Sequence, residues 1–176
     1  KSRDALGYIS FEQLKSNNFD NYLFTILKAS ASELCIKFLP LWENNINIYN
    51  DILNLCYIVN SDKYFLIGKY IKWEISFLGH LGYGLNIEKC SISKDYQEAF
   101  FISPKTGNAV SFEVGKKYSK KLFKIPKCMK ESFVRNYYDD YLAALDITMY
   151  FLNKILENKK TKFIFRNQIL SFLENT

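Results

Sequence analysis

The sequence is poor in the residues that most catalytic sites need. It contains one histidine, His80, so a histidine triad or a multi-histidine metal site could form only around that residue. The only adjacent carboxylates, Asp139 and Asp140, would point in different directions on a helix. The glycines at 82 and 84 lack the spacing of a phosphate loop. We predict no enzyme, and we interpret His80 as a structural or capping residue at a helix C-terminus.

Long apolar runs and paired cysteines are also missing. No window reaches the roughly 18 apolar residues of a membrane span, and no signal-peptide pattern opens the chain. The four cysteines have no zinc-knuckle spacing; Cys35 and Cys56 fall in apolar helical patterns, and Cys90 and Cys128 in connecting segments. We therefore predict a soluble, cytoplasmic protein with reduced thiols and no membrane contact.

Apolar residues make up 48 % of the chain, enough for one sizeable core. They recur at the three- and four-residue intervals of amphipathic helices over five ranges: 17–38, 46–59, 62–81, 130–157 and 162–173. The first helix should stop at Pro40, and the third should begin at an N-cap within 60–62 and end at Gly82 and Gly84. The third is apolar over more than half its circumference, which predicts a central place in a bundle.

The helical period is absent between 83 and 126, where short apolar runs alternate with turn signals. Residues 99–103 and 108–112 could pair as a hairpin across "PKTG", with Gly107 at positive φ. The predicted fold is mainly α, a helical bundle with a small β-containing insert at about 83–127. Residues 1–14 form an extended apolar segment without a partner strand nearby, and we predict that they finish a domain that begins upstream.

Positive charge is concentrated rather than spread evenly. The net charge is +6, and seven lysines but no carboxylate lie between Lys116 and Lys130. Such a concentration suits a phosphate backbone, an acidic peptide or an anionic membrane, although a solvated face explains it equally well. Tyr118 and Phe123 interleave with the lysines and could stack on bases. The candidate contact residues are Lys116, Lys117, Lys120, Lys121, Lys124, Lys127 and a second cluster of Lys159, Lys160, Lys162 and Arg166.

Several segments occur in an order typical of a known family. The run "LGYGLNIEKC", then "FISPKTGNAVSFEVGKKYSKKLFKIP", follows an amphipathic helix and closely resembles the C-terminal domain of the bacterial RecO family of recombination mediators. The opening "DALGYISFEQLKS" is similar to the last strand of that family's N-terminal OB-fold. The closing "KKTKFIFRNQIL" resembles its basic C-terminal segment, with Arg166 at the arginine position.

The resemblance implies a non-enzymatic role in DNA repair and recombination at the nucleoid. Members bind single- and double-stranded DNA, anneal complementary strands and, with the partner RecR, help load RecA onto DNA coated by single-stranded DNA-binding protein. They also recognise the acidic C-terminal tail of that protein, so the candidate basic residues would contact DNA or the tail. The main alternative is an adaptor that docks acidic peptides without binding DNA itself. An enzyme centred on His80 is a more distant one.

One departure from the family concerns metal. Some members hold zinc in this insert with two Cys-x-x-Cys pairs, which stabilise a small β unit without a core. Here the corresponding positions are Cys90 with Ser93, and Ser111 with Val114. A single thiolate with no histidine nearby cannot make a structural zinc site. We therefore predict a zinc-finger-like but metal-free insert and no cofactor.

Overall fold

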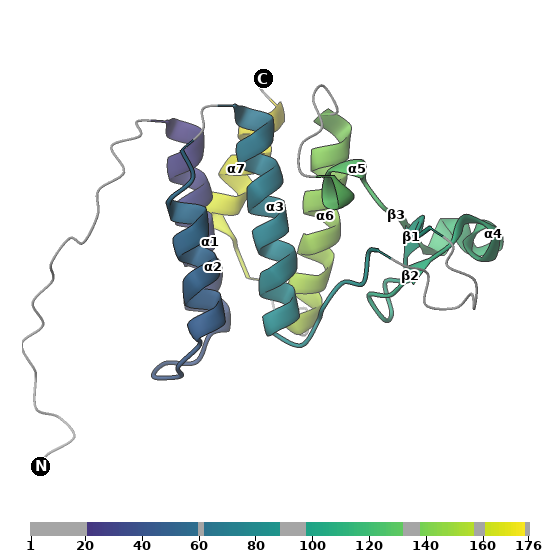
Figure 1. Cartoon of the computed structure of the whole chain (residues 1–176), viewed down its shortest axis with the longest axis horizontal. Coiled ribbons are helices and arrows are strands. Elements are labelled where there is room, and N and C mark those ends of the chain that lie inside the picture. The colour runs from purple at the N-terminus through teal and green to yellow at the C-terminus, as the bar shows by residue number, and fades with distance from the viewer. Residues whose placement is uncertain (1–20, 60–61, 89–97, 132–137, 157–160, 175–176) are drawn as a thin grey trace, which may run out of the picture.

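Five long helices form the body of the molecule in the computed structural model, which describes residues 21–59, 62–88, 98–131, 138–156 and 161–174. The long helices are α1 (Tyr22–Phe38), α2 (Ile46–Cys56), α3 (Lys63–His80), α6 (Tyr138–Ile155) and α7 (Ile164–Glu174). Figure 1 shows them side by side, with a small β-containing unit projecting from one side of the bundle. The mainly α fold with a small β insert is confirmed.

Local sequence signals explain where several of these helices begin and end. The side chains of Asn21 and Asp62 act as N-caps, accepting hydrogen bonds from Phe24 N and Phe65 N at 3.2 and 3.0 Å. α1 ends two residues before Pro40, which cannot continue a helix. Gly82 follows α3 at a φ of 83°, the left-handed conformation predicted for a helix C-terminus.

The helix predicted for 130–157 is wrong at its start. Lys130 is the last residue of a short separate helix, α5 (Lys127–Lys130), and Glu131 after it is extended. Residues 132–137 lie outside the described ranges, and α6 is described from Tyr138. α5 is fixed against α6 because Cys128 N donates a 2.7 Å hydrogen bond to Asp140 Oδ2. Cys128 therefore lies in a helix rather than in a connecting segment, and its side chain is buried.

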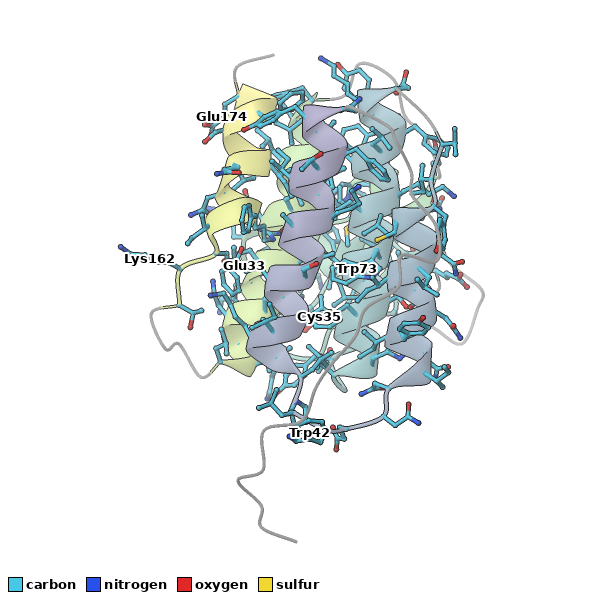
Figure 2. The ribbon with its side chains drawn as sticks, turned by 90° about the vertical axis from the view of Figure 1, so that its left-hand side faces the viewer. Glu33, Cys35, Trp42, Trp73, Lys162 and Glu174 are labelled. Atoms are coloured by element: carbon cyan, nitrogen blue, oxygen red, sulfur yellow. The ribbon has the colours of Figure 1, made fainter. Side chains whose placement is uncertain are left out.

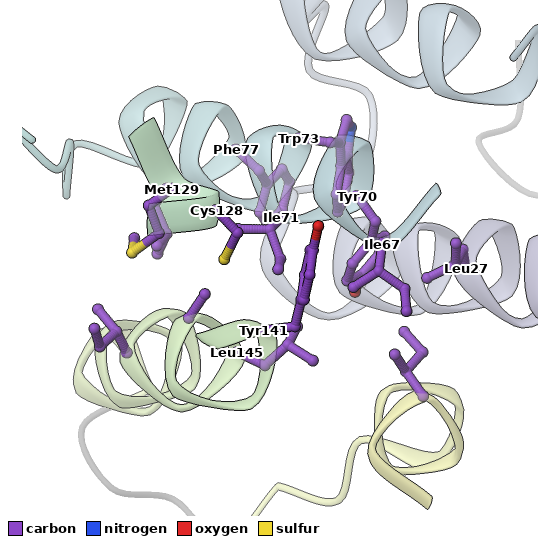
Figure 3. Close-up of a cluster of buried hydrophobic side chains, with 14 of the residues drawn as sticks. Leu27, Ile67, Tyr70, Ile71, Trp73, Phe77, Cys128, Met129, Tyr141 and Leu145 are labelled. Atoms are coloured by element: carbon purple, nitrogen blue, oxygen red, sulfur yellow. The ribbon is translucent and has the colours of Figure 1, made fainter. Parts of the chain in front are cut away.

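α3 is the central helix, as its apolar circumference predicts. It packs against α1, α2, α5 and α6, while α7 lies against α1 and α6. Figure 2 shows the bundle from the side of α1, and Figure 3 shows Tyr70, Ile71 and Phe77 of α3 packed with Tyr141 and Leu145 of α6. The apolar α3 side chains with at most 1 % of their surface exposed are Leu66, Ile67, Tyr70, Ile71, Phe77 and Leu78. Their apolar contacts provide the main driving force for folding of the bundle.

The insert, for which we use the described residues 98–127, contains the predicted hairpin. β1 (Phe101–Ile102) pairs antiparallel with β2 (Ala109–Val110), and Gly107 has a φ of 72° in the turn. A third strand that the sequence did not reveal, β3 (Phe123–Lys124), pairs antiparallel with the other side of β1. Between β2 and β3 the chain forms α4 (Phe112–Gly115) and the 3₁₀ helix η1 (Lys116–Lys121), so the first part of the lysine run is helical rather than a loop.

Contacts with α6 hold the insert in a defined position beside the bundle. Lys154 Nζ donates hydrogen bonds to the carbonyl oxygens of Pro104 and Lys105 at 3.1 and 2.7 Å. The rings of Phe123 and Tyr150 meet edge to face with centroids 5.1 Å apart. The turn of the hairpin and β3 are therefore both attached to α6.

Candidate nucleic-acid interface

All six lysines predicted as contacts in the insert lie at exposed positions. We call them the insert lysines: Lys116, Lys117, Lys120, Lys121, Lys124 and Lys127. Four of them belong to η1, and the other two lie in β3 and at the start of α5. Because a 3₁₀ helix has about three residues per turn, Lys117 and Lys120 share one face of η1 and Tyr118 shares another with Lys121. The structure thus gathers most of this charge on one short element.

Aromatic rings underlie part of this surface. Lys116 Nζ lies 5.8 Å from the centroid of the Phe112 ring, and Lys124 Nζ lies 5.6 Å from that of Phe100. Phe100 and Phe112 in turn meet edge to face with centroids 5.1 Å apart. Cation–π contacts of this kind are worth about 0.5–1 kcal/mol at exposed sites. They orient these two lysines without neutralising them.

Lys117, Lys120 and Lys121 have no carboxylate partner within the part of the chain that the structure describes. The seventh lysine of the run differs, because Lys130 Nζ lies 2.9 Å from Glu98 Oε1 and also donates to the carbonyl oxygen of Ala99. The hydrogen bond and charge of Lys130 lower the pKa of Glu98. Lys117, Lys120 and Lys121 are therefore the lysines of η1 best placed to meet an anion from outside.

The second predicted cluster is not a single surface. Lys159 and Lys160 lie outside the described residues, and Lys162 is exposed just before α7, pointing outward in Figure 2. Arg166 is 0 % exposed. A side chain with no exposed surface cannot meet DNA or a peptide in this conformation, so Arg166 leaves the set of candidate contact residues.

Arg166 instead forms a buried ion pair with Glu74 of α3. Its Nε lies 2.8 Å from Glu74 Oε1 and its Nη2 lies 3.1 Å from Glu74 Oε2, a two-point contact. Nη2 also donates to Thr148 Oγ1 at 2.9 Å and to the carbonyl oxygen of Leu145, both on α6. Burial by itself lowers the pKa of Arg166, but the Glu74 charge and hydrogen bonds outweigh it, so the pKa is raised.

Further polar groups complete this network. The Tyr70 hydroxyl donates to Glu74 Oε1 at 2.7 Å, and Ser30 Oγ of α1 lies 2.6 Å from the same hydroxyl. Burial, followed by the charge of Glu74, raises the pKa of Tyr70 well above its ordinary value. The network links α1, α3, α6 and α7. Glu74 lies on the apolar face of the 62–81 pattern, four residues after Tyr70 and four before Leu78, and this was the sequence signal for the network, because a buried carboxylate needs a partner.

His80 lies in a polar cluster whose composition resembles a catalytic triad but whose geometry does not. Its Nε2 is 3.1 Å from Asp51 Oδ2 and 3.4 Å from Ser76 Oγ, while Ser76 donates directly to Asp51 at 2.6 Å. In a triad the carboxylate bonds Nδ1 and the hydroxyl bonds Nε2, so that the imidazole can take the hydroxyl proton. Here the Ser76 hydroxyl donates its proton to the Asp51 carboxylate instead of to the imidazole. The contact joins the end of α3 to α2, which supports the structural interpretation of His80.

The structure describes two of the four positions that correspond to the family's zinc ligands. Ser111 is the residue before α4 and Val114 lies within α4, whereas Cys90 and Ser93 lie outside the described residues. Over the described ranges, no three His, Cys, Asp or Glu side chains come together in a way that could hold a metal ion. The absence of zinc stays a prediction. Cys35, Cys56 and Cys128 form no disulfide within the described ranges.

Comparison with known proteins identifies the class. Residues 23–162 match the family model described as Recombination protein O C terminal. Relatives include the DNA repair proteins RecO of Wolbachia pipientis, 32 % identical over 98 % of this chain and 75 % of its own length, and of Ehrlichia chaffeensis, 31 % identical over 96 % and 73 %. RecO of Rickettsia canadensis is 35 % identical over 65 % of this chain and 46 % of its own length.

The class is therefore that of bacterial DNA repair proteins. Within it, the chain belongs to the RecO family, as the order of its sequence segments predicts. No solved structure matches the chain. None of the helices that the structure describes is both long enough and apolar enough to cross a membrane.

Proposed function

We propose that this chain serves DNA repair and homologous recombination as a mediator at the bacterial nucleoid. It binds and anneals DNA strands and, with RecR, helps load RecA onto DNA coated by single-stranded DNA-binding protein. Membership of the RecO family supports the general role. The observation that carries the DNA contact is the group of exposed lysines on η1, for which the described part of the chain offers no carboxylate partner.

A DNA backbone fits this surface for electrostatic reasons. Lysines that neutralise phosphates release condensed counterions, and this supplies most of the sequence-independent affinity for DNA. The insert lysines belong to a unit that stands beside the bundle (Figure 1), so a strand could follow η1 along that side of the molecule. Such contacts would not distinguish sequences, which suits a mediator that acts on any damaged strand.

The test is a titration of a fluorescent single-stranded oligonucleotide at several salt concentrations. Replacing Lys117, Lys120 and Lys121 together by Glu should weaken binding at least about tenfold. It should also lower the slope of log affinity against log salt by roughly 0.7 for each lost phosphate contact. An unchanged affinity and slope would show that this surface does not contact DNA.

The matched control makes the same change of charge on the bundle. Lys28, Lys63 and Lys69 lie on α1 and α3 and stand over the rings of neighbouring aromatic residues. Replacing these three by Glu alters net charge equally, so any loss of affinity common to both variants reflects the overall field of the protein. Repeating the comparison with the rate of annealing of two complementary strands tests the annealing role by the same logic.

A second candidate is recognition of an acidic peptide tail with an aromatic end. A pocket of about 330 Å³ lies between α1 and α7 and is lined largely by apolar atoms, including those of Ile36 and Phe165. Lys37 stands at this pocket. The carboxylate of Glu33, also at the pocket, is engaged because it accepts from Ile164 N and Phe165 N at 2.8 and 3.0 Å and lies 3.6 Å from Lys37.

A buried ring with carboxylates around it would suit a pocket that combines apolar walls with lysine. Replacing Ile36 by Glu should weaken binding of an acidic, phenylalanine-ended peptide at least about tenfold while leaving the affinity for single-stranded DNA unchanged. The control is Val59→Glu, which adds the same charge at another exposed apolar position. If only the peptide binds to the chain, the adaptor function replaces DNA binding.

The partnership with RecR and the loading of RecA rest on family membership alone.

A further inference from the structure

We propose that the insert contains a pocket for a single unpaired nucleobase, with Tyr118 as its stacking surface. This inference rests on the proposed binding of single-stranded DNA. It adds a site that binds a base rather than a phosphate. The ligand would be one base splayed out of a single strand, while the phosphates beside it meet the lysines of η1.

The pocket lies between the hairpin and the helical segment that follows it. Its volume is about 350 Å³, within the range of roughly 300–1,000 Å³ that is typical of small-molecule sites. Val110 of β2, Val114 of α4 and Leu122 after η1 supply apolar walls. Thr106 and Asn108 contribute polar atoms on the hairpin side. A mainly apolar hollow with polar groups along one side suits a flat ring whose edge carries hydrogen-bonding atoms.

Tyr118 provides the ring that a base would stack on. It lines the pocket and yet remains 61 % exposed, whereas Tyr70 and Tyr141 in the core of the bundle have no exposed surface. Stacking of a base on an aromatic side chain tolerates every base, because all of them present a π face. Asn108 can both donate and accept a hydrogen bond through its side-chain amide, so it can meet the edge of different bases.

The charges around the pocket favour a nucleic acid over an apolar peptide. None of the described residues that line it is charged, and Lys121 lies one 3₁₀ turn after Tyr118, on the same face of η1. Lys105 is exposed in the hairpin turn beside Thr106. An apolar centre with lysines at its edge matches a base flanked by two phosphates. A duplex does not fit in the same way, because its bases are already paired and stacked.

The experiment compares two oligonucleotides of equal length, oligo-thymidine and an abasic strand with the same phosphates. The chain should bind the thymidine strand at least about fivefold more tightly, the effect expected of one stacked base. Tyr118→Ala should remove this preference by weakening only the thymidine strand, and Tyr118→Phe should keep it. The control variant, Tyr49→Ala, removes a similarly exposed tyrosine from α2 and should change neither affinity.

Each other outcome is informative. Equal binding of both strands by the unaltered chain would overturn the base pocket and leave the proposed DNA contact standing. If neither strand bound, the proposed function would fail and the pocket with it. If Tyr118→Ala weakened both strands equally, the tyrosine would be part of the backbone contact and the pocket would be wrong. Since Tyr118 is largely exposed, its replacement should leave the fold intact, which thermal unfolding would verify.

Discussion

In the helical bundle, the guanidinium of Arg166 is enclosed and paired with Glu74, whereas in the insert Lys117, Lys120 and Lys121 stand on an exposed 3₁₀ helix. The sequence presents both as basic residues in basic segments. The buried charge ties helices together, and its removal leaves an unpaired carboxylate in the core. The exposed charges are hydrated and available to a partner. The same residue chemistry therefore supports stability in one region and binding in the other.

The two regions also differ in how they are held together. The bundle buries long apolar helix faces around α3, but each strand of the insert has only two residues. The insert relies on the Phe100, Phe101 and Phe112 rings and on its attachment to α6 through Lys154. It should therefore open more easily than the bundle.

The largest expected effect comes from breaking the buried ion pair. Arg166→Ala should lower the free energy of unfolding by about 3–5 kcal/mol, because Glu74 keeps its charge without its partner. Urea denaturation monitored by circular dichroism measures this loss. The double variant Arg166→Met with Glu74→Leu should recover much of it, since no charge then remains unpaired. A stable Arg166→Ala variant with weakened DNA binding would instead restore Arg166 as a contact residue.

A smaller effect should follow from filling space inside the insert. A Cβ at Gly115 would lie 2.9 Å from Phe101 Cε2 and 3.2 Å from Leu122 Cδ1, so Gly115→Ala forces the ring to move. Overpacking of this kind costs about 1–3 kcal/mol. Limited proteolysis should cut the insert of this variant faster while the bundle stays resistant. In the control, Gly79→Ala, the new Cβ meets nothing within 4 Å, and cleavage should not change.

Detaching the insert from α6 should cost less again. Lys154→Met keeps much of the side-chain volume but removes the hydrogen bonds to the Pro104 and Lys105 carbonyls. The free energy of opening the insert should fall by about 1 kcal/mol, because both carbonyl oxygens can form hydrogen bonds with water instead. Hydrogen exchange should accelerate at Gly107, whose amide bonds Ser103 O within the hairpin. Equal acceleration in α3 would mean that the two regions unfold together.

The smallest effect concerns the pH dependence of one thiol in the bundle. Burial raises the pKa of Cys35 to about 11, so at pH 8 its reactive thiolate is far scarcer than for a free cysteine with a pKa of about 8.5. Alkylation of Cys35 at pH 8, followed by peptide mass spectrometry, should be about tenfold slower in the folded chain than in urea. It should stay slow in Gly115→Ala and become faster in Arg166→Ala. Fast labelling in both variants would contradict the independence of the two regions.

Periodicity was a good guide to the bundle and a partial guide to the insert. The five long helices, except for the start of the one expected at 130–157, the central place of α3 and the hairpin at Gly107 were predicted, since the patterns behind them depend on neighbours within a few residues. β3 was missed because a two-residue strand is defined by its pairing with β1, not by its own pattern. η1 was missed because lysine runs are common in loops as well as in helices.

The candidate site divides in the same way. The exposure of the insert lysines could be expected from the sequence. The run contains many lysines and no carboxylates, and a small core cannot bury unpaired lysines. The burial of Arg166 could not be predicted from its basic segment, because its partner lies 92 residues earlier in the chain. The pocket beside Tyr118 likewise required the hairpin, α4 and η1 to be placed against one another.

The sequence alone determined the helices, the hairpin turn, the concentration of lysines and the likeness to the RecO family. These depend on spacing, composition and the order of segments. Only the tertiary structure decided which charges are buried, which strand completes the sheet and where a hollow remains beside an exposed ring. The physical reason is that local conformation is set by residues three or four positions away. Desolvation and packing, in contrast, depend on whichever side chains the whole fold brings into contact.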